Sequence, residues 1–264
     1  MNKRILIVSL ARCGSSAIYE LVKKNLSKDC TSFFEPTYDI FINQVLPCLE
    51  QNNDTCAKVI LRPYLAFEKR FEDKFNHVIG LVRDPRDNLI SRLLFRMVSP
   101  AFVENGRVYE ELLPLFEQKV ENPDSISVCE LFKRMEKTKL MEPMIENRVR
   151  QNLDLFMHWH SNCKICTIYK YEEFIRGCFE KISFMIGSTH FSTNFNEVVN
   201  PSIRRSAKFG EWRQWFTQSD IEFLRPRFNK YMDVYGYEDD WALEENQSIS
   251  HETSIDYIRK YAKL

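Results

Sequence analysis

The chain has 264 residues, of which 44% are hydrophobic and 28% are charged, and this composition excludes a disordered or collagen-like polymer. Its Lys and Arg residues equal its Asp and Glu residues at 37 each, so no net field attracts nucleic acid or an anionic membrane. Any site for an anion must therefore be local. A chain of this length can bury a large core without a metal or a disulfide, and we expect a single domain over residues 1–264.

The cysteines and the N-terminus bear on the location of the protein. Eight cysteines are spread from Cys13 to Cys178 without a secretion signal, which favours reduced thiols. The basic and apolar start imitates a signal peptide, but Arg12 stands where a small residue is needed for cleavage. No stretch approaches the length of a membrane span. These observations predict a soluble, cytoplasmic protein.

The first predicted element is a strand over residues 4–10, an apolar run rich in Ile and Val that is too short for a core helix. A turn over residues 11–16 follows. The next apolar residues recur at helical spacing and predict a helix: Ile18, Leu21, Val22 and Leu26.

Strands and helices then alternate along the chain. Further strands are predicted at residues 31–34, 57–61 and 77–82, and helical stretches at residues 39–50 and 66–75. A helix then begins with Asp84 as its cap and Pro85 at its first position. Such alternation predicts an α/β fold in which helices cover both faces of a parallel sheet.

The second half departs from this pattern. Residues 99–160 contain no strand signal and are expected to form a helical insert that builds the acceptor pocket. A strand at 164–169, a helix at 172–186 and an irregular polar stretch at 187–205 follow. We predict a last helix at 219–235, kinked by Pro226, and a frayed acidic tail.

Three polar segments follow predicted strands or precede the last helix, where ligands of parallel sheets bind. The first is the loop after residues 4–10, where Arg12, Cys13, Gly14, Ser15 and Ser16 lead into a helix whose free N–H groups favour an anion. The loop differs from G-x-x-x-x-G-K-[ST], because Ser15 replaces the lysine and Arg12 must supply the charge. An ordinary strand-to-helix turn is the alternative interpretation.

The second segment is Arg83-Asp84-Pro85-Arg86-Asp87, with Ser91 one turn beyond Asp87 on the same helix face. A guanidinium and a hydroxyl in this arrangement can reach a second phosphate. Alternatively, Asp84 only caps the helix and the arginines form solvated ion pairs.

The third segment spans residues 204–217 and combines four cations with a glycine and four aromatic side chains. Such a segment suits a lid on a nucleotide, since cations bind phosphate and aromatic rings bind the base. A solvated basic turn before a helix is the alternative. The cations are Arg204, Arg205, Lys208 and Arg213.

Together these segments resemble the sulfotransferase family, which uses 3′-phosphoadenosine 5′-phosphosulfate (PAPS) as donor and releases adenosine 3′,5′-bisphosphate (PAP). Residues 12–16 look like its 5′-phosphosulfate loop, and residues 83–91 look like its 3′-phosphate motif. Tyr171-Glu172-Glu173-Phe174 resembles its Tyr-Glu-Asp-Leu element, and Gly210-Glu211-Trp212 its closing Gly-x-Trp segment. Because Ser206 and Ala207 follow Arg205, it stays open which of Arg204, Arg205 and Lys208 meets the 3′-phosphate.

The resemblance implies a P-loop-like α/β fold and transfer of a sulfuryl group to an acceptor hydroxyl or amine. Glu35 lies where carbohydrate-type members place a base, and burial beside Phe33 and Phe34 would raise its pKa. Glu35 as a helix-entry carboxylate is the alternative. Arg12 would stabilise charge on the leaving phosphate. Cytosolic small-molecule members use a histidine just after the third strand, where this chain has Arg62, Pro63 and Tyr64 and no histidine. Arg62 could take the place of the lysine with which some members contact the donor sulfate or the acceptor.

Other functions remain open at this point. A zinc site at Cys163 and Cys166 is disfavoured, because the two side chains should point to opposite faces of a strand, and we expect no metal. The rival functions are a phosphoryl-transferring nucleotide kinase and a nucleotide sensor without transfer activity. The favoured acceptor is a carbohydrate, glycolipid or small metabolite, with no nucleic acid as partner.

Overall fold

The computed structural model of the protein describes residues 2–51, 53–62, 69–187 and 208–262. The chain folds into two compact units. The first unit comprises Met1–Arg83 and Asp154–Arg204, and the second unit comprises Asp84–Leu153 and Arg205–Leu264.

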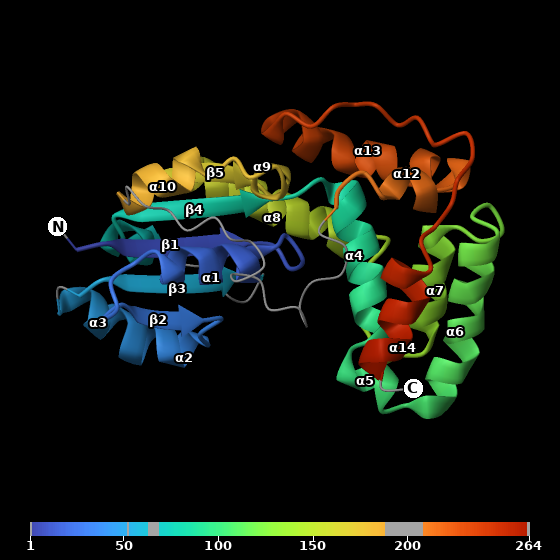
Figure 1. The fold of residues 1–264 in the computed structure, drawn as a ribbon, viewed down its shortest axis with the longest axis horizontal. Helices are drawn as coiled ribbons and strands as arrows, with labels where there is room; N and C mark the ends of the chain where they lie inside the picture. Colours follow the sequence, from blue (N-terminus) through green and yellow to red (C-terminus); the bar gives the residue numbers. More distant parts are fainter. Residues whose placement is uncertain (1, 52, 63–68, 188–207, 263–264) are drawn as a thin grey trace. The chain divides into compact units, whose positions relative to one another are not determined.

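The first unit is built on a five-stranded sheet in the order β2-β3-β1-β4-β5, and all of its strand pairs are parallel (Figure 1). Ile5 to Val8 of the central strand are fully buried, as the apolar run predicted. The predicted α/β fold with a parallel sheet is therefore confirmed. The strands are β1 (Arg4–Ser9), β2 (Thr31–Phe34), β3 (Thr55–Ile60), β4 (His77–Val82) and β5 (Cys166–Lys170).

The strand order explains where a ligand can bind. The chain leaves β1, forms β2 and β3 on one side of it, and then forms β4 and β5 on the other side. In parallel sheets of this kind, ligands bind outside the carboxyl ends of the strands, at the point where the strand order reverses. The loops after β1 and β4 both belong to this edge.

Helices cover the sheet of the first unit. The first helix, α1 (Ser15–Lys24), packs on β1 and β3 through Ile18 and Val22 (Figure 1). The predicted helix at 172–186 is wrong in its continuity, because Gly177 adopts a φ of 76° and separates α9 from α10. The other elements are α2 (Tyr38–Ile40), the π-helix η1 (Phe41–Val45), α3 (Leu46–Glu50), the 3-10 helix η3 (Lys69–Lys74), α9 (Tyr171–Ile175) and α10 (Glu180–Ile186).

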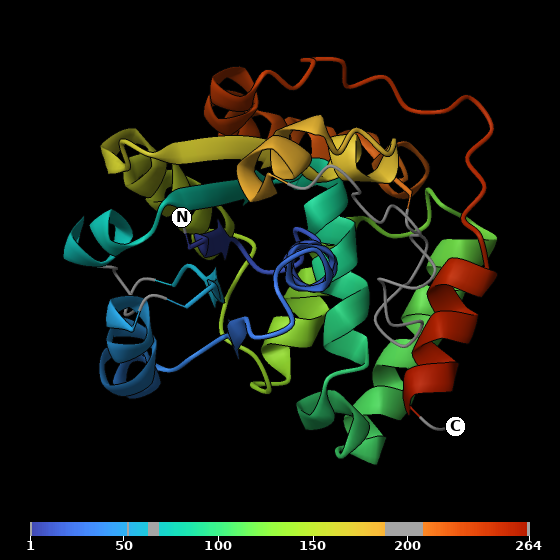
Figure 2. The ribbon, with the colours of Figure 1, turned by 60° about the vertical axis from the view of Figure 1, so that its left-hand side comes forward.

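The second unit is helical, and it contains most of residues 99–160, for which the sequence predicts a helical insert. Its final helix, α14 (Tyr257–Ala262), contacts α4 (Figure 1), and the π-helix η4 (Glu252–Asp256) that precedes it lies beside α6 (Figure 2). The expectation of a frayed tail is wrong, because Ile255 and Ile258 are fully buried there. The other helices are α4 (Pro85–Met97), α5 (Pro100–Val103), α6 (Gly106–Glu121), α7 (Val128–Lys137), α12 (Trp212–Trp215) and α13 (Gln218–Tyr235); α8 (Arg148–Asn162) ends the insert.

Two predictions fall on segments without described structure. The irregular stretch predicted at 187–205 lies outside the described residues from residue 188 onward, and so does the start of the helix predicted at 66–75. Within the described part of the chain, no helix has the length and apolar character needed to span a bilayer.

Candidate active site

The loop after β1 presents the N-terminus of α1. Gly14 caps this helix in the left-handed conformation with a φ of 83°, and as a glycine it offers no side-chain acceptor to the N–H groups of the first turn. Arg12 also has a positive φ, 69°. The N–H groups of a helix start and the positive end of the helix dipole favour an anion, so the anion site that the sequence predicts at this loop stays a prediction with suitable local geometry.

Arg12, Arg83 and Tyr171 meet around this loop from the ends of three strands. The guanidinium of Arg83 donates a hydrogen bond to the carbonyl of Arg12 over 3.2 Å and lies 4.3 Å above the ring of Tyr171. A Cβ at Gly14 would lie 2.5 Å from that ring, so only glycine allows the close approach. The structure thus brings together two motifs that are 71 residues apart in sequence.

A second cluster lies beside the same helix turn. Glu35 follows β2, has a φ of 46°, and forms an ion pair with Lys58 of β3. The Lys58 ammonium also donates to the hydroxyl of Ser16, 3.1 Å away, and lies 4.0 Å from the centre of the Phe34 ring. We call Glu35, Lys58, Ser16 and Phe34 the Lys58 cluster.

The expected burial of Glu35 is wrong. Its side chain is 36% exposed, and the neighbouring Phe34 is 51% exposed, because β2 is an edge strand whose carboxyl end is open to solvent. The Glu35 carboxylate is paired with a buried cation, since the Lys58 side chain is only 1% exposed. Burial lowers the pKa of Lys58, Glu35 opposes this effect and Arg12 adds to it.

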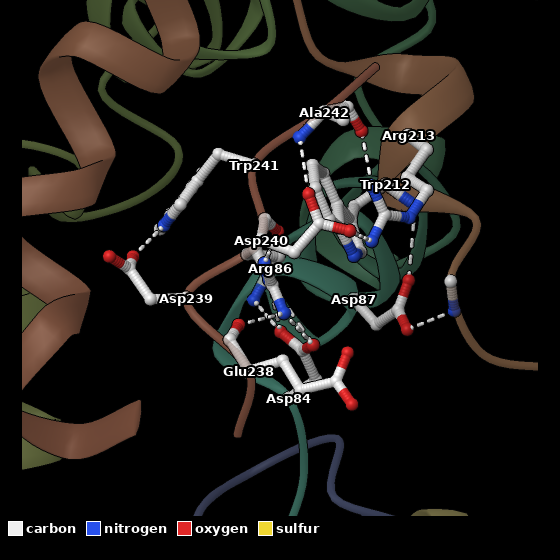
Figure 3. A network of polar contacts seen from close by, with 11 residues as sticks. Asp84, Arg86, Asp87, Trp212, Arg213, Glu238, Asp239, Asp240, Trp241 and Ala242 are labelled. Carbon is white, nitrogen blue, oxygen red and sulfur yellow. Dashed lines mark hydrogen bonds and ion pairs between the residues drawn. The ribbon is translucent and has the colours of Figure 1, made fainter. Parts of the chain in front are cut away.

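In the segment predicted to bind the 3′-phosphate, Asp84 and Arg86 have structural contacts. Asp84 caps α4 by accepting from the N–H of Arg86, as predicted, and pairs with its guanidinium at 2.7 Å (Figure 3). Arg86 also donates to the carbonyls of Glu238 and Asp240 and lies over the ring of Trp212. Arg86 is therefore buried, and the alternative of a solvated ion pair is wrong for this residue.

Asp87 links the second and third segments of the sequence. Its carboxylate accepts hydrogen bonds from the N–H groups of Gly210 at 2.5 Å and Trp212 at 3.1 Å (Figure 3). Gly210 adopts a φ of 84°, which favours glycine at this turn. The closing Gly-x-Trp segment is thus anchored by a carboxylate of the 3′-phosphate motif.

The remaining predicted site residues have simple placements. Cys13 and Ser15 are buried in the loop and the first turn of α1, and Ser91 is buried in the second turn of α4. Lys208 is exposed. Arg204 and Arg205 lie outside the described residues.

The cysteine pair considered for zinc differs in geometry from the prediction. The thiols of Cys163 and Cys166 interact, so the expectation that they point to opposite faces is wrong; the hydrogen bond between them, with burial, raises the pKa of Cys166. Cys163 lies just past α8 and before β5, so its side chain does not follow the alternation of side chains between the two faces of a strand. In the described ranges, no group of three His, Cys, Asp or Glu side chains could hold a metal ion.

Sequence reasoning missed Lys58. It lies in the buried strand Thr55–Ile60, and the sequence pattern of this strand predicts only a core element. A lysine inside a strand that is buried on both faces is itself a signal, because an ammonium is rarely buried without a partner.

The arrangement can bind an anion and accept a proton. The α1 N-terminus, Arg12, Lys58 and Arg83 provide positive charge at one edge of the sheet in a chain without net charge. Glu35 is the carboxylate beside them and is open to solvent. These residues fit a donor that carries phosphate and sulfate groups, next to an acceptor with an exchangeable proton.

Comparison with known proteins agrees with this chemistry. The family described as "Sulfotransferase domain" matches residues 2–236. A crystal structure of mouse sulfotransferase SULT7A1 complexed with PAP is similar in fold, with a TM-score of 0.55 and 15% sequence identity over 88% of this chain and 85% of the mouse chain. No curated protein matches the chain significantly. Because the family match covers nearly the whole chain, this protein belongs to the sulfotransferase family.

Proposed function

We propose that this sulfotransferase uses PAPS as its donor, releases PAP, and sulfates a hydroxyl of a carbohydrate, a glycolipid or a small metabolite. The observation that supports this best is the meeting of Arg83, Tyr171 and the Arg12 loop at one edge of the sheet. The mouse sulfotransferase of similar fold was crystallised with PAP, which supports the same donor here. All eight cysteines are free thiols, which supports a reducing compartment such as the cytoplasm.

The residues have distinct tasks in this reaction. PAPS, when bound, supplies an activated sulfuryl group on a phosphate. The first turn of α1 and Arg12 hold the phosphosulfate end and stabilise the charge that remains on the phosphate when its bond to sulfur breaks. Glu35 takes the proton of the acceptor hydroxyl as the new sulfur–oxygen bond forms.

Arg83 is assigned to the 3′-phosphate, for which the sequence also predicts Ser91. Tyr171 keeps the Arg83 guanidinium in place by lying under its plane. The open position of Glu35 at the edge strand favours a large acceptor, such as a carbohydrate, over a small molecule enclosed in the core.

Donor binding is tested by calorimetry with PAP. Arg83→Ala removes a charge-assisted bond of about 1.5–3 kcal/mol, so the dissociation constant should rise about 10- to 100-fold. Arg176→Ala removes an exposed guanidinium at the end of α9 and serves as the matched control. Equal affinities of the Arg83→Ala variant and the wild type would remove Arg83 from the site.

Transfer is tested with sulfur-radiolabelled PAPS and a cell extract, followed by mass spectrometry of the labelled product. Glu35→Gln should lower the turnover rate about 10²- to 10⁴-fold while PAP still binds. Glu50→Gln changes an exposed carboxylate at the end of α3 and should leave the rate unchanged. Binding of PAP without any labelled product would support the sensor instead.

A further inference from the structure

The Lys58 cluster contains a buried cation that the proposed mechanism does not use. Lys58 lies in the middle of β3 and its side chain is only 1% exposed. Its bonding partners come from two other elements, Glu35 after β2 and Ser16 of α1, and the Phe34 ring lies against it. One ammonium thus joins the proposed base to the proposed donor loop.

Burial of this lysine is costly, which indicates a function beyond packing. Removal from water penalises the charged form, and the charge of Arg12 adds to this penalty. The Glu35 carboxylate offsets part of the cost. An apolar side chain of similar length would fill the same space without the penalty, and such replacements are often neutral or stabilising.

The Lys58 ammonium lies where it can bond either to Glu35 or to an anion held at the first turn of α1. Ser16 belongs to the first turn of α1, whose N–H groups form the anion site, and its hydroxyl is 3.1 Å from the ammonium. An anionic group held at this turn therefore competes with Glu35 for the same cation. Arg62, which the sequence suggested for a contact with the sulfate, is exposed beyond the end of β3.

We propose that Lys58 couples donor binding to the base: it holds Glu35 when the donor is absent, and it moves its hydrogen bond to the sulfuryl end of a bound donor. This inference rests on the proposed function. The carboxylate that Lys58 releases is then available for the acceptor proton, while Lys58 keeps its own proton throughout. Glu35 thus becomes an effective base only when a sulfuryl group is present.

The test compares two ligands that differ in one group. PAPS carries the sulfuryl group and PAP lacks it, so a contact of Lys58 with that group changes only the affinity for PAPS. Calorimetry without acceptor gives both dissociation constants. Lys58→Met should weaken PAPS binding about tenfold or more and change PAP binding less than about twofold. Lys58→Arg should restore part of the loss, and Lys74→Met, an exposed lysine of η3, is the control.

Glu35→Gln tests the competition itself. Removing the carboxylate frees the ammonium, so PAPS should bind several-fold more tightly while the affinity for PAP stays the same. In the Lys58→Met background, Glu35→Gln should have no effect on either ligand, because no shared cation remains. This double variant separates competition from simple repulsion between Glu35 and the donor, which would tighten PAPS binding in both backgrounds.

The remaining outcomes of the binding measurements would overturn the coupling alone or the proposed function as well. Equal losses for PAPS and PAP in Lys58→Met, or no loss for either, would overturn the coupling but leave the donor assignment intact. A wild-type protein that binds neither ligand would overturn the proposed function as well. Thermal unfolding of Lys58→Met and Lys58→Gln checks the fold, and we expect both to unfold near the wild-type temperature.

Discussion

Asp87 should be the residue on which the closing segment of the second unit depends. It lies in the first turn of α4 and is 1% exposed. Its two carboxylate oxygens accept from the N–H groups of Gly210 and Trp212, more than 120 positions later in the chain. Asp87→Ala leaves both N–H groups without this acceptor.

The expected loss of unfolding free energy in Asp87→Ala follows from the two hydrogen bonds. A hydrogen bond to a charged group contributes about 1.5–3 kcal/mol, which gives about 3–6 kcal/mol for the pair. Gly210 is only half-buried, and water can replace its partner, so the lower end of that range applies. A favourable interaction of Asp87 with the α4 dipole contributes less than about 1 kcal/mol and cannot account for such a loss.

Denaturant unfolding measures the loss, and hydrogen exchange locates it. We expect Asp87→Ala to lower the unfolding free energy by about 3 kcal/mol and to accelerate exchange at the amides of Gly210 and Trp212. Asp87→Asn keeps one acceptor and should lose roughly half as much. Asp233→Asn, an exposed carboxylate of α13, is the matched control. A loss below about 0.5 kcal/mol in Asp87→Ala, with unchanged exchange, would refute the reasoning.

Two further substitutions test burial and backbone geometry. Burial lowers the pKa of Lys119 to about 8 from 10.5, so between these pH values the unfolded chain holds this proton more tightly and stability rises with pH. Lys119→Met should therefore raise the unfolding free energy at pH 7, by at most about 3 kcal/mol because the substitution also removes the hydrogen bond to the Pro123 carbonyl. This gain in stability should shrink from pH 8 to 10. A gain that does not depend on pH, measured by chemical denaturation, would contradict this prediction. Gly14→Ala should destabilise the fold and weaken PAP binding, because its Cβ would collide with the Tyr171 ring in a left-handed turn. Gly106→Ala, where the added Cβ meets nothing within 4 Å, should do neither, and equal melting temperatures for the two variants would exclude the collision.

The elements of the first unit were predictable because their signals are local. The apolar runs predicted β1 and β4 to within one residue. A local signal of the same kind, Asp84 followed by Pro85, predicted the start of α4 in the second unit. The helix expected at 172–186 failed at Gly177, whose left-handed conformation ends α9. The prediction of a frayed tail was wrong because the run of apolar residues at helical spacing is short there. The burial of Ile255 and Ile258 depends on helices that are far away in sequence.

The candidate site shows the same division. The loop at Arg12 to Ser16 and the motif at Arg83 are visible in the sequence because their residue types and spacing follow strands directly. The environment of Glu35 was wrongly predicted, since neighbours in sequence suggested an apolar pocket and neighbours in space supply Lys58. Arg204 and Arg205 stay predictions for the 3′-phosphate.

The sequence by itself determined the family, the parallel sheet and the residues that border its carboxyl edge, because hydrophobic periodicity and short motifs are properties of adjacent positions. Only the tertiary structure decided which charges pair across strands. Lys58 meets Glu35 because β2 and β3 are adjacent in register, and Asp87 meets Gly210 because a helix and a distant loop pack together. Such pairings depend on the arrangement of elements that are far apart in the chain, so no local pattern of residues records them.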